Sequence, residues 1–284
     1  MAEITSIRPI QTHRMQSLVI PREHGAWGML LVPMFVGAVV GLQHGTNIGS
    51  LALFFVAAVA LFWLRTPVES YLGTSPMRAQ TAEEKRGVLL AAAGIAAIAG
   101  GAILSLFWNG RNELLIVIGG ACGVAFAAQT ILKKLGRKYR MTSQMMGAIG
   151  LTSTSAAAYY VLCGRFDEVA IALWLANWAF SGNQIHFVQL RLRAHKASCS
   201  DEKFSFGYSF FLGQVVLVAV IAAAISTGLL PKLALLAFAP ALVRGFAWFF
   251  QKQAPLELSW LGITELLHGI TFGTLLISGF YLLH

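Results

Sequence analysis

The chain has 284 residues, of which 57% are hydrophobic and only 12% are charged, with a formal net charge of +9. Ordinary soluble domains carry about 25% charged residues, so this composition excludes a compact soluble fold and favours a bilayer as solvent. The positive charge is typical of basic cytoplasmic loops, which argues against nucleic acid as a partner. The three cysteines form no CxxC pair, so neither a disulfide framework nor a thiolate zinc site is supported.

Nine apolar runs follow the polar N-terminal segment, and a membrane-crossing helix needs about 20 such residues. The limits of these runs are 25–43, 50–64, 88–108, 114–132, 145–162, 169–190, 206–229, 233–250 and 259–283. The second run continues to about residue 71. The sequence therefore predicts an all-α polytopic transmembrane helical bundle of about nine spans. We expect a cytoplasmic segment at 1–24 and a single integral membrane domain at 25–284.

The basic residues orient this bundle. With the N-terminus in the cytoplasm, 17 of the 21 lysines and arginines lie in cytoplasmic segments and three lie in outer loops. The last one, Arg244, lies inside a span. This bias follows the positive-inside rule. It predicts a multi-pass protein of the bacterial cytoplasmic (inner) membrane, with the N-terminus inside and the C-terminus outside.

Two local patterns support the helices. Thr81 and Glu84 have the spacing of a capping box just before the third run. Glycine pairs with the GxxxG spacing, which lets helices approach closely, occur at 37 and 41, at 119 and 123, and at 269 and 273. We expect all three pairs to serve helix packing.

Polar side chains inside a membrane are costly, so each one is a candidate for a site. In the predicted topology the strongly polar ones all lie in the cytoplasmic half, whereas the outer half is almost purely apolar. This pattern indicates a cavity open to the cytoplasm or the inner leaflet. The candidate ligand-binding residues are Glu23, His24, Arg65, Glu69, Asn183, His186, Arg191, Arg244, Glu265 and His268.

A purely structural interpretation competes for some of these residues. Arg244 and Glu265 lie too deep to reach water easily. We predict that both face the bundle interior, within reach of each other or of a shared ligand, and a buried pair of the two would satisfy both charges. Arg65 and Arg191 lie nearer the span ends, from which long side chains extend to the interface.

One site chemistry is a metal or haem site. Its ligands would be histidines and glutamates, namely Glu23, His24, His186, Glu265 and His268. Glu265 and His268 share a helical face, but bundle di-metal sites use two such motifs and the chain has one. We therefore assign no metal, and the cofactor stays unknown.

The other site chemistry is an anionic head group. Its cations would be Arg65, Arg78, Arg191, Arg193 and Arg244, since guanidinium binds phosphate bidentately. Asn183 and Gln184 would orient the head group, and an apolar tunnel above it would hold a lipid tail.

The stretch Pro21-Arg22-Glu23-His24-Gly25-Ala26-Trp27, followed by Leu31-Val32-Pro33, resembles the opening of the YwiC-like family of bacterial membrane proteins. Gln184-Ile185-His186-Phe187-Val188, followed by Arg191, is similar to the central segment of that family. The resemblance implies an integral membrane protein of poorly defined activity, and it transfers no catalytic residues.

The layout of nine helices, with polar loops after the second and sixth, also resembles UbiA-type prenyltransferases. Aspartate-rich motifs in those loops hold magnesium and a prenyl diphosphate in that family. This chain has only two aspartates, Asp167 and Asp201, and the corresponding positions offer Glu69, Asn183 and His186. The resemblance therefore implies a scaffold without the aspartate–magnesium reaction.

The leading hypothesis is that the protein binds or modifies an isoprenoid-like or other lipid-soluble molecule. One alternative is a small-solute transporter, although the apolar outer half counts against a transport path. The other is a haem-binding, metal-binding or assembly factor for a membrane complex. Whether the protein is an enzyme, such as a divergent UbiA-like transferase, stays open.

Overall fold

The computed structural model describes residues 14–21, 24–110, 113–195, 200–251 and 256–282, and all regular structure within these ranges is helical. The all-α prediction is therefore confirmed. The helices are α2 (His24–Gly41), α3 (Ile48–Leu72), α4 (Ala82–Trp108), α5 (Glu113–Lys134), a 3₁₀ turn η1 (Arg137–Tyr139), α6 (Arg140–Thr152), α7 (Thr154–Cys163), α8 (Glu168–Ala194), α9 (Ser200–Ser226), α10 (Ala234–Phe250) and α11 (Leu258–Tyr281).

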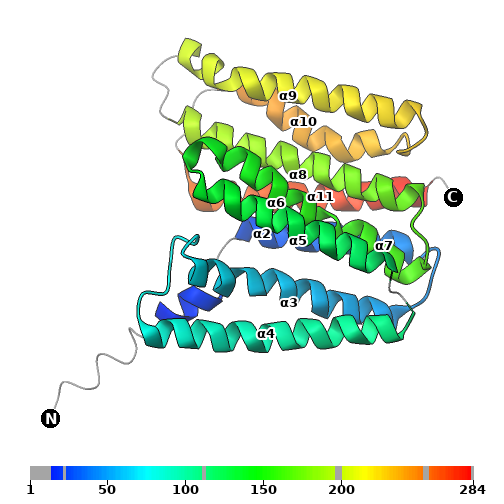
Figure 1. Ribbon diagram of the computed structural model, residues 1–284. Coiled ribbons are helices and arrows are strands. Elements are labelled where there is room, and N and C mark those ends of the chain that lie inside the picture. The colour runs from blue at the N-terminus through cyan, green and yellow to red at the C-terminus, as the bar shows by residue number, and fades with distance from the viewer. Residues whose placement is uncertain (1–13, 22–23, 111–112, 196–199, 252–255, 283–284) are drawn as a thin grey trace.

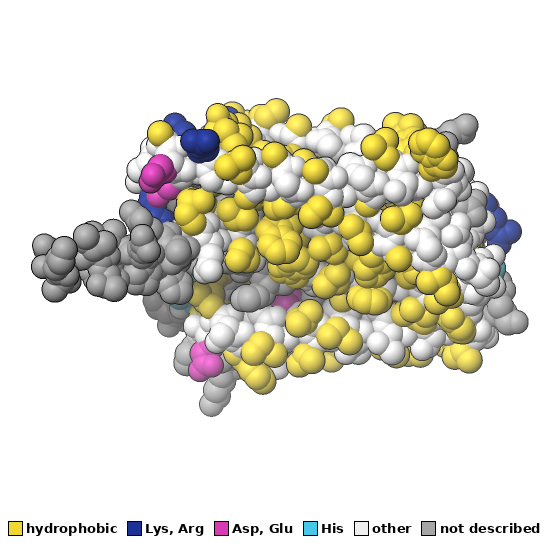
Figure 2. Space-filling view, turned by 90° about the horizontal axis from the view of Figure 1, so that it is seen from below, with side chains coloured by type: hydrophobic (Ala, Val, Ile, Leu, Met, Phe, Trp, Pro, Cys, Tyr) yellow, Lys and Arg dark blue, Asp and Glu magenta, His cyan; other side chains and the backbone are white. Residues whose placement is uncertain are grey.

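Most of these helices run alongside one another and connect at the two ends of the bundle (Figure 1). Within the described residues α3, α4, α5, α9 and α11 are long and apolar enough to cross a membrane, and α2 and α10 are shorter apolar helices. Figure 2 shows hydrophobic side chains over the middle of one face, with most of the visible charged side chains at its two ends. The chain is a multi-pass membrane protein; its count of nine spans stays a prediction.

The helix boundaries follow the predicted runs closely, with one exception. The run predicted at 145–162 is divided into α6 and α7, which meet at Ser153. The hydroxyl groups of Thr152, Ser153 and Ser155 donate to the carbonyls of Ala148, Gly150 and Thr152 over 2.7, 2.7 and 2.8 Å. Consecutive hydroxyl side chains that bond to preceding carbonyls compete with the regular helical ladder and bend it.

Two of the three glycine pairs serve helix packing as predicted. A Cβ at Gly37 would stand 1.9 Å from the carbonyl oxygen of Ser155, so only glycine permits this approach of α2 to α7. A Cβ at Gly273 would meet Val32 at 3.0 Å. The prediction for the pair in α5 is wrong within the described chain, because a Cβ at Gly119 or Gly123 would meet nothing within 4 Å.

The bundle has three parts in Figure 1: α3 and α4 at one side, α9 and α10 at the other, and the remaining helices between them. An aromatic cluster packs between α8, α10 and α11. Phe180 stacks on Phe272 with 4.0 Å between the ring centres, and Phe238 lies edge-on to Phe272 with 5.0 Å between the ring centres. Such ring pairs add about 0.5–1.5 kcal/mol each to the burial of their area.

The C-terminal end of α3 contacts the N-terminal segment. Residues 14–19 are helical, and the carbonyl of Leu18 accepts a hydrogen bond from Ser70 Oγ over 2.9 Å. The capping box at the start of α4 is confirmed, because Glu84 N donates to Thr81 Oγ1 over 3.1 Å and Thr81 N donates to Glu84 Oε2 over 3.3 Å. Arg14 in turn forms an ion pair with Glu84, which ties this segment to α4.

Candidate functional site

A polar cavity of about 420 Å³ lies among α2, α3, α5, α6, α8 and α11. Its walls come from the end of the bundle where α2 and α6 begin and where α3, α5 and α8 end. The polar residues that line it are Arg65, Gln129, Lys133, Arg140, Gln144, Asn177, Ser181, Gln184, Gln189 and Glu265. The volume is within the usual range of small-molecule sites, about 300–1,000 Å³.

A buried carboxylate organises the cations of this cavity. Glu69 Oε1 accepts hydrogen bonds from Arg65 Nε at 2.9 Å and from Lys133 Nζ at 2.7 Å. Arg65 and Glu69 share one face of α3 because they are four residues apart, while Lys133 comes from the last turn of α5. Two cations from two helices are therefore held together at the cavity wall.

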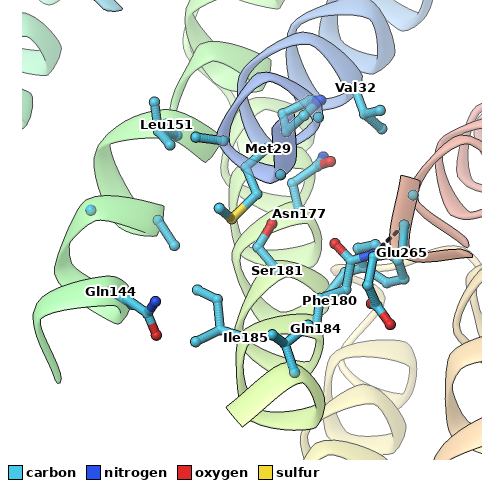
Figure 3. A pocket seen from close by; sticks show the side chains of 18 of the residues that line it. Met29, Val32, Gln144, Leu151, Asn177, Phe180, Ser181, Gln184, Ile185 and Glu265 are labelled. Atoms are coloured by element: carbon cyan, nitrogen blue, oxygen red, sulfur yellow. Dashed lines mark hydrogen bonds between the residues drawn. The ribbon is translucent and has the colours of Figure 1, made fainter. Parts of the chain in front are cut away.

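The face of α8 supplies neutral polar groups. Asn177, Ser181 and Gln184 are spaced by four and three residues, which places them on one side of the helix. Figure 3 shows these three along α8, with Gln144 across from them on α6 and Met29 extending from α2 toward the space between. The Gln184 amide donates to the carbonyl of Glu265 over 2.7 Å, which links α8 to α11.

The predicted pair of deep charges is confirmed. Arg244 on α10 donates to Glu265 Oε1 on α11, and its guanidinium lies 4.1 Å from the centre of the Phe187 ring. The other carboxylate oxygen of Glu265 is buried without a hydrogen-bond partner among the described residues. Since Glu265 also lines the polar cavity, the pair forms part of the cavity wall.

A second, apolar cavity of about 600 Å³ adjoins the polar one. It lies between α3 and the end of α4 on one side and α5 on the other, with α6 and α7 contributing to the wall. Gly119, Gly120 and Gly123 leave the α5 side open, because a Cβ at any of them would meet nothing within 4 Å. The two cavities share four lining residues, which are Arg65, Gln129, Gly147 and Leu151.

The predicted site residues fall into two groups. Arg65 and Glu265 line the polar cavity and Glu69 holds its cations, whereas Asn183, His186, Arg191, Arg244 and His268 are not among its lining residues. His186 lies edge-on to Phe210 at 5.2 Å, and His268 Nδ1 lies 2.7 Å from the carbonyl of Thr264. Glu23 lies outside the described residues, and so does the side chain of His24.

The predicted site residues do not include seven polar residues of the cavity wall, which are Gln129, Lys133, Arg140, Gln144, Asn177, Ser181 and Gln189. Lys133 and Arg140 flank the short connection between α5 and α6. The positive-inside rule is enough to explain basic residues at such a position, so the sequence does not mark them as site residues. The amides gave a usable signal, because Gln129 lies near the end of the run at 114–132 and Gln144 directly precedes the run at 145–162.

No group of three or more histidine, cysteine, aspartate or glutamate side chains that could hold a metal ion occurs among the described residues. The side chains of Glu23 and His24 fall outside this statement.

Apolar helices of spanning length and charged bundle ends define a multi-pass α-helical membrane protein, here with an internal polar cavity. Residues 20–160, about half of the chain, match the model of the family described as YwiC-like protein. The chain therefore belongs to the YwiC-like family, as the resemblance at Pro21–Trp27 predicted. The matched range includes all three cations that line the cavity, Arg65, Lys133 and Arg140.

No curated protein matches the chain, and no solved structure does. The UbiA-like arrangement of the helices stays a prediction.

Proposed function

We propose that the protein binds a lipid-soluble molecule, with its head group in the polar cavity and its apolar tail in the apolar cavity. One observation carries the proposal: the two cavities share Arg65, Gln129, Gly147 and Leu151 as walls. A single amphiphilic ligand extending past these residues would satisfy both environments at once.

The helix ends support the same orientation of the ligand. The polar cavity lies near the bundle end that carries Lys133 and Arg140, and the apolar cavity extends from it along α3 and α5. In the orientation that the basic residues predict, with the N-terminus inside, the head group would lie at the cytoplasmic side of the inner membrane and the tail within the hydrocarbon core. An isoprenoid-like chain or an acyl chain meets the chemical requirement of the apolar walls.

The driving force for the tail differs from that in water. A tail that leaves the bilayer exchanges one apolar environment for another, so close packing and not water exclusion decides its affinity. Three glycines of α5 line the volume in which the tail would pack, and they are Gly119, Gly120 and Gly123. A Cβ added at Gly123 would meet no heavy atom within 4 Å, and Gly123 lines the apolar cavity, so a longer side chain there would extend into the volume proposed for the tail.

The test compares two Gly→Leu variants after gentle purification, by mass spectrometry of the extracted lipids. Gly123→Leu fills part of the apolar cavity, whereas Gly94→Leu on α4 adds the same side chain where a Cβ also meets nothing within 4 Å and lines neither cavity. We expect a lipid that copurifies with the wild type and Gly94→Leu to be lost from Gly123→Leu, at equal expression and unfolding temperature. Equal lipid content in all three proteins would contradict the proposal.

A further inference from the structure

Gln129 on α5 lies where the two cavities meet. It is one of the four residues that both cavities share, and its side chain is the uncharged polar one among them. Gln129 is only 6% exposed. Its backbone carbonyl accepts a hydrogen bond from Ser143 Oγ over 3.1 Å, whereas its side-chain amide has no hydrogen-bond partner among the described residues. Because a buried amide that stays unpaired is costly, a ligand atom that pairs with it gains affinity.

Gly147 on α6 makes room for this amide. A Cβ at Gly147 would stand 2.6 Å from Gln129 Nε2 and 3.0 Å from Gln129 Oε1, so the amide lies directly against the backbone of α6. The amide is the far end of a flexible side chain and can move aside. A methyl group at residue 147 would therefore displace the amide from the junction of the cavities without forcing α5 and α6 apart.

A ligand that extends from one cavity into the other passes the Gln129 amide at the point where its head group joins its tail. The amide carries two N–H donors and one carbonyl acceptor. We infer that the head group is joined to the tail through an oxygen atom, which accepts a hydrogen bond from the Gln129 amide. The inference rests on the proposed function, since it assigns the link within the same ligand. It favours long-chain phosphate esters, carboxylic esters and alcohols over head groups that a carbon–carbon bond joins to the tail.

Decyl phosphate and undecylphosphonate test this assignment. They have the same shape and differ in the linking atom, which is an oxygen in the first and the carbon of a CH₂ group in the second. Their affinities for the full chain are measured in a neutral detergent, at a pH that ionises both head groups fully. Gln129→Leu removes the amide and Gly147→Ala displaces it. The control is Gln214→Leu, which removes a buried, unpaired amide of α9 that lines neither cavity.

The quantity compared is the ratio of the two affinities, because a ratio cancels the intrinsic difference between the head groups. We expect this ratio to favour decyl phosphate about three- to tenfold more strongly in the wild type than in Gln129→Leu, the scale of one hydrogen bond. Gly147→Ala should lose the same factor, and Gln214→Leu should keep the wild-type ratio. Gly147→Ala decides alone if Gln129→Leu does not fold.

Two different results separate this inference from the proposed function. A wild-type ratio in Gln129→Leu, or an equal loss in Gln214→Leu, overturns the oxygen link while the proposed lipid binding survives. Gly123→Leu should weaken both ligands alike, because it fills part of the volume proposed for the tail. Unchanged binding of both ligands to Gly123→Leu would contradict the proposed function itself.

Discussion

Lys133 Nζ donates to Glu69 Oε1 over 2.7 Å, and this ion pair joins the end of α5 to the end of α3. Further along the same two helices the apolar cavity separates them. The pair therefore holds the junction of the two cavities together. It also keeps Lys133 and Arg65 at a common point of the polar wall.

Replacing Glu69 with Gln should destabilise the protein, because two partly buried cations lose their carboxylate. The expected loss is about 1–3 kcal/mol, below the cost of breaking a fully buried pair, since Lys133 stays partly exposed. Thermal unfolding in detergent measures it, with Glu83→Gln as the control at an exposed position one residue from Glu84. Identical unfolding temperatures for the two variants would show that the pair does not join the helices.

The Arg244–Glu265 pair predicts a specific order of stabilities. Glu265→Gln leaves the Arg244 guanidinium charged in the bundle interior, at a cost of about 2.5–3.5 kcal/mol. Adding Arg244→Gln removes the unpaired charge, so the double variant should recover much of that loss. Unfolding curves of the wild type, both single variants and the double variant measure the coupling. A double variant no more stable than Glu265→Gln would contradict a charge pair.

The contact between α2 and α7 makes Gly37 intolerant of any side chain. Gly37→Ala would place a methyl group 1.9 Å from the Ser155 carbonyl oxygen, and the helices must separate. We expect a loss of about 2–3 kcal/mol, at the upper end of overpacking costs. Gly94→Ala is the matched control, because it meets nothing within 4 Å and should raise helix stability by up to about 1 kcal/mol. Thermal unfolding distinguishes them, and equal behaviour would refute the close contact.

Much of the fold follows from the sequence because a membrane helix is recognisable as a long, uninterrupted run of apolar residues. The limits of α8, for example, lie within a few residues of the run at 169–190. The division at Ser153 was not predicted, since hydropathy is insensitive to hydroxyls that bond to carbonyls of their own helix. The GxxxG spacing does not distinguish two uses of glycine, because it identifies only where small residues lie. Gly37 allows a close contact between two helices, whereas Gly123 lines a cavity.

The site was only partly predictable. Arg65, Glu69 and Glu265 were found because charge inside a span is costly and therefore conspicuous. Lys133 and Arg140 were not found, because the positive-inside rule already explains why a basic residue lies at the end of a span. The lateral arrangement of α3 against α5, which brings Lys133 to Glu69, depends on tertiary packing that no single run encodes.

The predicted orientation can be tested with single cysteines in a chain whose Cys122, Cys163 and Cys199 are replaced by alanine. A cysteine at Arg78 should react with a membrane-impermeant maleimide only after permeabilisation, because the α3–α4 connection is predicted to be cytoplasmic. A cysteine at Lys232, between α9 and α10, should react from outside intact cells. The opposite pattern would reverse the topology and with it the side on which the polar cavity opens.

Photolabelling locates the tail of a ligand whose head group lies in the polar cavity, and so shows whether one ligand extends from the polar cavity into the apolar one. An alkyl phosphate with a diazirine at the end of its tail is bound to the full chain, irradiated, and the labelled peptides are identified by mass spectrometry. A ligand that extends into the apolar cavity should be linked to residues 54–68 of α3 and 115–126 of α5, and excess decyl phosphate should abolish these labels. Labels spread over outward-facing helices such as α9, and unchanged by the competitor, would contradict it.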